Sequence, residues 1–227
     1  MKKQLRILLA GIAMVASSSG MCAPTYGSVV VPPGVYFGAG NPNGNFNIDT
    51  QNGLELALRA KNRTPVGPVL IDGSSGVYSV DGGFCTSGCG SPKAKWNYEF
   101  SIHTTDGSLL SNYIFRLGVD HDPSAGTNFS YINPVTHWAD NAMDGLLGIQ
   151  NSQNISFGDT PGGPINANAT GLYDFVLEAY GANDLQLQQL LAQVDITVQV
   201  VPEPGSLALF GLGLAGLAAL GRRKVLK

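Results

Sequence analysis

The stretch WNYEFSIH, residues 96–103, decides the fold class. Large apolar side chains stand at every second position of this stretch, and polar side chains occupy the positions between them. Because successive side chains of a strand point to opposite faces of a sheet, this period of two predicts a β-strand with one face toward a core. The same alternation recurs in YIFRLGVD at 113–120, at 173–179 and at 194–200. The sequence therefore predicts four half-buried strands.

Weaker strand signals lie between these four segments, and pairs such as Asn-Gly and Asp-Gly separate them. The weaker candidates are 28–36, 53–60, 69–71, 76–80, 127–132 and 154–157. Roughly seven to ten short strands with polar turns predict an all-β fold, an antiparallel β-sandwich of the jelly-roll or immunoglobulin-like kind over residues 24–200. Residues 184–194 fit a short helix or a hairpin, and the strand that follows favours the hairpin.

The composition excludes several protein classes. Charged residues make up only 13% of the 227 residues, and apolar residues make up 44%. These values argue against a coiled coil and against a highly charged disordered chain. Between residues 24 and 201 there are six basic and 15 acidic residues, a net charge of −9. A nucleic-acid partner is excluded, because phosphate binding needs a cationic face.

The first 23 residues have the three zones of a secretory signal peptide. Lys2, Lys3 and Arg6 give a basic start, an apolar run follows at 7–15, and small residues follow at 16–20. The apolar run is too short to span a bilayer. We therefore expect residues 1–23 to direct the chain to the Sec export machinery and to be removed.

The C-terminal segment, residues 201–227, has the pattern of a membrane anchor. An apolar run at 205–221 follows Pro204, and Arg222 and Arg223 follow the run. As a helix this run is about 25 Å long, and basic side chains that reach toward the lipid headgroups can make up the rest of a bilayer. The sequence predicts a transmembrane helix at 205–221, with the basic end in the cytoplasm and residues 24–200 outside it.

The same tail resembles the PEP-CTERM sorting signal of Gram-negative, biofilm-forming bacteria. The resemblance rests on three elements in order: the Pro-Glu-Pro motif, the Gly/Ala/Leu-rich helix and the Arg pair. The residues are Val201, Pro202, Glu203, Pro204, Arg222 and Arg223. The resemblance implies that an exosortase recognises the tail, after which the protein is attached at the cell surface or released. The two prolines also keep the backbone extended and accessible to a protease.

Cys85 and Cys89 lie close together between two predicted strands. Outside the cytoplasm such a pair favours a disulfide, and the glycine between them, Gly88, allows a tight loop. The chain-entropy model gives this small loop a stabilisation of at most about 2 kcal/mol. A Cys-x-x-Cys redox motif and further zinc ligands are both missing from this stretch.

Asp120, Asp122 and Asn128 place oxygen atoms on a loop after a predicted strand, as a calcium site would. An EF-type loop does not fit, because Ala125 stands where glycine is required and Tyr131 stands where the bidentate glutamate belongs. The alternative is that these side chains bond their own backbone in turns, and this interpretation is favoured. We expect no cofactor, with calcium at these residues as the other hypothesis.

Trp138 and Tyr131 are the candidates for stacking on a sugar ring, and Trp138 falls in a predicted loop. For a glycoside hydrolase the candidate carboxylates are Glu55, Glu99 and Glu178. Alternation along their strands places these three side chains on solvent faces, which disfavours a catalytic pair.

Together these features predict an exported, non-enzymatic protein. It would be tethered to the inner membrane by its C-terminal helix and then be delivered to the cell surface or secreted. The expected role is structural or adhesive, with the exosortase and Sec machinery as partners and extracellular polysaccharide as a further one. The alternatives are a carbohydrate-binding module of that polysaccharide and a secreted hydrolase.

Overall fold

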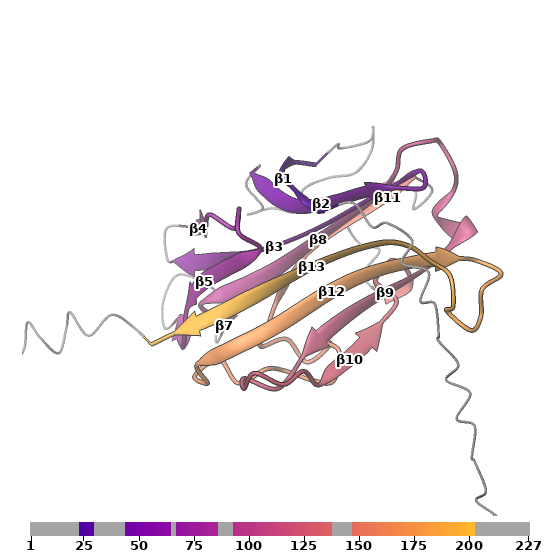
Figure 1. The fold of residues 1–227 in the computed structure, drawn as a ribbon. Coiled ribbons are helices and arrows are strands. Elements are labelled where there is room, and N and C mark those ends of the chain that lie inside the picture. Colours follow the sequence, from indigo (N-terminus) through magenta and orange to yellow (C-terminus); the bar gives the residue numbers. More distant parts are fainter. Residues whose placement is uncertain (1–22, 30–43, 65–66, 86–92, 138–146, 203–227) are drawn as a thin grey trace, which may run out of the picture.

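The computed structural model describes residues 23–29, 44–64, 67–85, 93–137 and 147–202, and Figure 1 shows how they are arranged. The predicted helix at 205–221 lies outside these residues, as does the predicted signal peptide except for its last residue. Strands predominate in the described part, as the period of two predicts. Helical segments in the described ranges are short: the 3₁₀ turn Leu110–Asn112 and α1, Pro134–His137.

The first sheet has six strands. Its order is β1 (Thr25–Ser28), β2 (Asn45–Gln51), β3 (Leu54–Thr64), β8 (Trp96–Thr104) and β11 (Gly148–Asn154), and β4 (Gly67–Leu70) pairs with the end of β3. All of these pairings are antiparallel. The predicted strand 96–103 is therefore β8, which lies between β3 and β11 inside this sheet.

The second sheet has five strands in the order β10 (Phe129–Ile132), β9 (Tyr113–Asp120), β12 (Gly171–Gly181), β13 (Leu190–Val201) and β5 (Val77–Asp81). A separate small hairpin is formed by β6 (Phe84–Cys85) and β7 (Lys93–Ala94). Every pairing in the second sheet is antiparallel except that of β5 with β13, which is parallel. The antiparallel prediction holds for the rest of the sheet.

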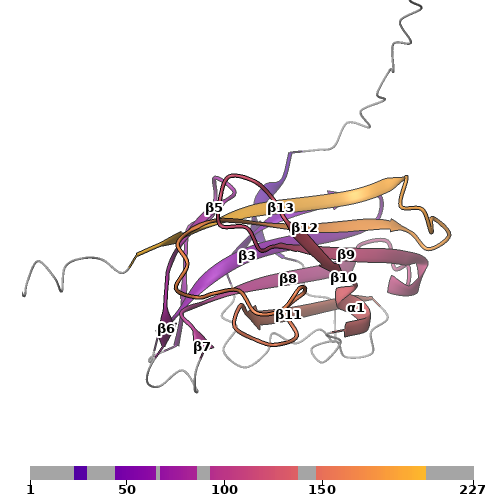
Figure 2. The ribbon, with the colours of Figure 1, turned by 90° about the horizontal axis from the view of Figure 1, so that it is seen from below.

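The two sheets pack face to face and enclose one main core (Figure 2). Aromatic side chains join the layers: the ring of Phe175 on β12 lies 6.1 Å from Trp96 and 4.9 Å from Tyr98 on β8, centroid to centroid. The core face of β8 consists of the apolar residues of the alternating pattern. The predicted β-sandwich is confirmed.

Several details differ from the sequence prediction, or decide an alternative that it left open. Residues 184–194 are part of a hairpin, because β12 and β13 pair directly and β13 already begins at Leu190. β2 was missed, because its sequence NFNIDTQ has only two large apolar side chains. The predicted strand 154–157 is wrong beyond Asn154, where β11 ends and a turn closed by Phe157 N–H donating to Asn154 O begins.

Candidate functional site

A groove of about 380 Å³ runs along the outer face of the five-stranded sheet. Because Tyr173, Phe175 and Leu177 of β12 point into the core, the residues between them point outward. The main outward-facing residues of the groove are Phe129 and Tyr131 of β10, Asp174, Val176 and Glu178 of β12, and Gln193, Asp195 and Thr197 of β13. We call this surface the β10–β13 groove.

One wall of the groove is aromatic. The side chain of Tyr131 is 43% exposed, and its ring lies 5.7 Å from that of Phe129. The guanidinium carbon of Arg116 stands 3.7 Å from the Tyr131 ring centroid and holds the ring in a cation–π contact. Gly118 pairs with Tyr131, and a Cβ there would lie 2.8 Å from Tyr131 Cε1 and 2.7 Å from Val176 Cγ1. The glycine therefore makes room for the ring on the sheet.

The opposite side of the groove is acidic. Asp174 Oδ1 accepts a hydrogen bond of 2.7 Å from Thr197 Oγ1. Glu178 Oε2 lies 3.6 Å from Arg116 Nε, and among the described residues this buried oxygen accepts no hydrogen bond. Asp195 is exposed on the neighbouring strand. The site thus has three carboxylates and one neighbouring guanidinium, that of Arg116, and its net charge is negative.

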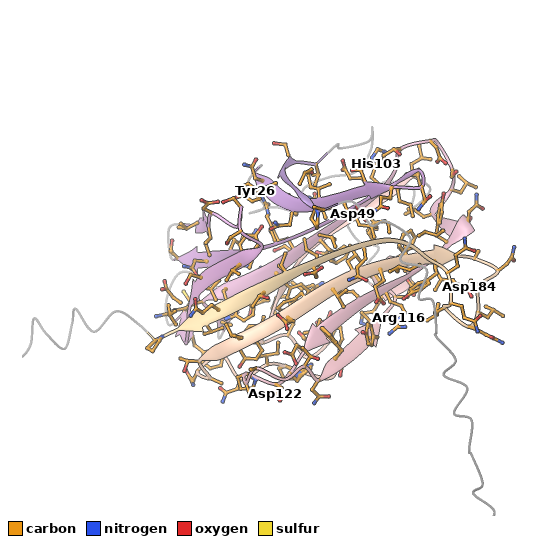
Figure 3. All side chains as sticks on the ribbon, viewed as in Figure 1. Tyr26, Asp49, His103, Arg116, Asp122 and Asp184 are labelled. Atoms are coloured by element: carbon orange, nitrogen blue, oxygen red, sulfur yellow. The ribbon has the colours of Figure 1, made fainter. Side chains whose placement is uncertain are left out.

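An apolar hollow of about 340 Å³ adjoins the groove on the far side of Tyr131. Tyr131 and Arg116 line the groove side of the hollow, and the other side includes Leu185 and Leu187 from the turn between β12 and β13. Leu185 is 83% exposed, so this turn presents an apolar side chain to solvent. Figure 3 labels Arg116 on this outer face and Asp184 in the turn.

The structure places one of the two sugar-stacking candidates in this site. Tyr131 stands in the groove wall, whereas Trp138 lies outside the described residues. Phe129, Asp174 and Asp195 were not among the predicted site residues. Asp174 and Asp195 alternate with core residues of β12 and β13, and Phe129 lies on the edge strand β10, but a single sequence does not show which strands pair.

The loop after β9 uses its carboxylates to hold turns. Asp120 Oδ1 accepts hydrogen bonds from the backbone N–H of Asp122 (2.9 Å) and of Asn128 (2.7 Å). Asp122 Oδ1 accepts one of 2.9 Å from Ser124 N–H, and this bond lowers the pKa of Asp122 below its usual 3.8. In the part of the chain that the structure describes, no three His, Cys, Asp or Glu side chains gather as metal ligands. The geometry supports turn formation, and calcium stays a prediction.

The expectation that Glu55 and Glu99 face solvent is wrong. Both side chains point away from the core, but they are only 6% and 1% exposed. Glu99 accepts hydrogen bonds from Arg59 Nε and Lys61 Nζ, and both of these residues are 1% exposed. Since Glu178 belongs to the outer face of the other sheet, the structure does not bring the three glutamates together as a hydrolase pair.

Cys85, at the end of β6, is disulfide-bonded and only 6% exposed. Cys89, its predicted partner, lies outside the described residues. The pairing of these two cysteines therefore stays a prediction.

The chain leaves the sandwich where the predicted sorting signal begins. β13 ends at Val201, whose carbonyl oxygen accepts a hydrogen bond of 2.9 Å from Gly82 N–H. Pro202 is exposed, and Figure 1 shows this yellow end of β13 at an edge of the fold. The other predicted signal residues, Glu203, Pro204, Arg222 and Arg223, lie outside the described residues. Within the described ranges no helix has the length and hydropathy needed to cross a bilayer.

Comparison with protein-family models identifies the C-terminal segment. The family model of the PEP-CTERM protein-sorting motif matches residues 200–224, from the last residues of β13 through the Arg pair. No match is found among the curated proteins. The matched segment contains the Pro-Glu-Pro motif at 202–204 and the basic residues at 222–224 in the expected order. Such a motif implies export, association with a membrane through the C-terminus and processing by an exosortase. The chain therefore carries a PEP-CTERM sorting motif, and this motif indicates an extracellular protein that is sorted by an exosortase.

Proposed function

We propose that the β-sandwich acts at the cell surface or in the extracellular matrix as a structural or adhesive component, without catalysing a reaction. The observation that carries this proposal is the direct continuation of β13 into the sorting motif, with Val201 still in the sheet and Pro202 outside it. A domain so close to the processed segment is displayed wherever the motif is delivered. The signal peptide at 1–23, the helix at 205–221 and the Sec machinery belong to the same proposal.

An attachment assay tests this role. We expect cells that lack the protein to attach less to a surface or to one another, and the wild-type chain to restore attachment. A chain truncated before residue 202 is the matched control, because it keeps the sandwich and lacks the sorting motif. We expect it to be exported without restoring attachment. Full restoration by the truncated chain would contradict a role that depends on sorting.

A second candidate function is that of a carbohydrate-binding module, and the β10–β13 groove favours it. Sugar sites combine an aromatic face, which covers the apolar side of a pyranose ring, with polar groups that bond the hydroxyls. Tyr131 supplies an exposed ring, and Asp174 and Gln193 supply polar groups on the neighbouring strands. The ring is preorganised by Arg116, which reduces the entropy lost when a ligand binds.

Retention on extracellular polysaccharide tests this second function. We expect the exported protein to be retained on the isolated polysaccharide, and Tyr131→Ala to be retained much less. Phe84→Ala is the control, because Phe84 is a 37% exposed aromatic residue that does not line the groove. Equal loss in both variants would contradict a specific role of the groove.

A further inference from the structure

The charge of the β10–β13 groove restricts the chemistry of a bound sugar. Asp174, Glu178 and Asp195 bring three carboxylates to the groove, and none of the described residues that line it is Lys or Arg. The nearest cation, Arg116, lies over the Tyr131 ring and pairs with Glu178. A sugar that carries a carboxylate or sulfate would meet repulsion here, whereas a cationic sugar would be attracted.

The register of the strands places the carboxylates around a flat apolar patch. Asp195 on β13 pairs directly with Val176 on β12, so it is a diagonal neighbour of both Asp174 and Glu178. Diagonal neighbours are about 7–8 Å apart in a sheet. Val176 is 7% exposed and forms the floor between them. A ring that lies on this floor has carboxylates around it and the aromatic wall of Tyr131 beside it.

The carboxylates keep unused acceptor capacity. Asp195 is exposed on β13. Asp174 bonds Thr197 through Oδ1. An ionised carboxylate offers about four lone-pair sites, so each of these groups can accept further donors. An ammonium group is the donor that matches them best, because it brings three N–H bonds and the opposite charge.

We propose that the β10–β13 groove binds an amino-sugar polymer with free amines, in which protonated hexosamine units place their ammonium groups against Asp195 and Asp174 and a sugar face against Tyr131. This inference rests on the second candidate function and names its ligand class. A neutral hexose polymer lacks the cation, and a polyuronate has the wrong charge.

Binding of three oligosaccharides to the full chain, solubilised from an exporting host, tests the proposal. The probes are hexamers of glucosamine, of N-acetylglucosamine and of galacturonic acid. The assay is run at about pH 5.5, so that the amines of the glucosamine hexamer are protonated. We expect the glucosamine hexamer to bind at least about tenfold more tightly than its acetylated form, because a charge-assisted hydrogen bond is lost on acetylation. The galacturonate hexamer should not bind.

Variants separate the groove from general attraction to an acidic protein. Asp195→Asn and Tyr131→Ala should each weaken binding of the glucosamine hexamer at least about tenfold. Asp72→Asn is the matched control: it removes an exposed carboxylate outside the groove, and the Oδ1 that accepts from Ser74 N–H is kept. Equal weakening by Asp72→Asn and Asp195→Asn would overturn the proposal.

The outcomes also distinguish this proposal from the function on which it rests. If the acetylated hexamer binds as tightly as the glucosamine hexamer and Tyr131→Ala abolishes both, the groove is a carbohydrate site and the amine proposal is overturned. If no hexamer shows binding that depends on Tyr131, both the amine proposal and the second candidate function are overturned.

Discussion

Replacing Glu99 by glutamine should destabilise the sandwich strongly, although Glu99 lies on the side of its sheet that faces away from the core. Glu99 is hydrogen-bonded to Arg59 and Lys61, and all three side chains are 1% exposed. The variant removes the negative charge and leaves two buried cations beside a neutral amide. Breaking a buried ion pair in this way costs about 3–5 kcal/mol.

The structure also limits the size of this loss. Burial already lowers the pKa of Lys61 below its usual 10.5, while Glu99 opposes that shift. Without Glu99, Lys61 can release its proton. At pH 7 this release costs at most about 5 kcal/mol, because the usual pKa of lysine lies about 3.5 units above this pH and each unit corresponds to about 1.4 kcal/mol. Arg59 keeps its charge, but it also keeps its cation–π contact with Phe46, whose ring centroid is 4.0 Å from the guanidinium carbon. We therefore expect a loss near 3–5 kcal/mol, smaller at higher pH.

Urea unfolding of the exported, oxidised protein measures this loss. With a slope of about 2 kcal/mol per molar urea, the midpoint should fall by about 1.5–2.5 M. The matched control is Glu178→Gln, which breaks a pair of 3.6 Å whose side chains are 28% and 14% exposed, and it should cost less than about 1 kcal/mol. The double variant Lys61→Met with Glu99→Gln should be more stable than Glu99→Gln alone. A Glu99→Gln midpoint within error of the wild type would refute the reasoning.

Three further predictions concern other parts of the chain. Burial raises the pKa of Tyr78 above its usual 10.0, so the unfolded chain loses this proton at a lower pH than the folded chain, and the free energy of unfolding should fall as the pH rises above about 10. Urea unfolding between about pH 9 and 11 should show a smaller fall for Tyr78→Phe than for the wild type, and an equal fall in both proteins would contradict this prediction. Reversing the charge of Arg222 and Arg223 together to glutamate should block C-terminal processing, and unchanged maturation on an immunoblot would speak against the predicted topology. The oxidised protein should have a mass lower by two hydrogen atoms than the reduced one, whereas labelling of both Cys85 and Cys89 as free thiols would rule out their disulfide.

The sequence predicted the core side of the fold well. In residues 96–103 the apolar side chains alternate strictly, and the same residues of β8 lie in the core. The strands at 113–120, 173–179 and 194–200 were found for the same reason. β2 escaped because it contributes few large apolar side chains. The parallel pairing of β5 with β13 escaped because alternation shows faces and not neighbours.

The outer faces were predicted less well, because their character depends on residues that meet only across strands. Glu99 is buried with Arg59, 40 positions away in the sequence, and nothing local to either residue indicates the pair. The groove likewise depends on the pairing of Asp195 with Val176 across the β12–β13 hairpin. Tyr131 was identified as a sugar-binding candidate, but its acidic neighbours became visible only with the strand register.

The most direct test of the sorting claim follows the chain in a host with its exosortase and in the same host without the enzyme. Cell fractions are probed for the sandwich, and the recovered protein is weighed by intact mass spectrometry. With the exosortase, we expect the sandwich outside the cytoplasm and lacking residues from near the 202–204 motif onward. Without it, the chain should keep its tail and stay in the membrane fraction. Full-length protein in the cytosol, or the same mass and location in both strains, would contradict the account.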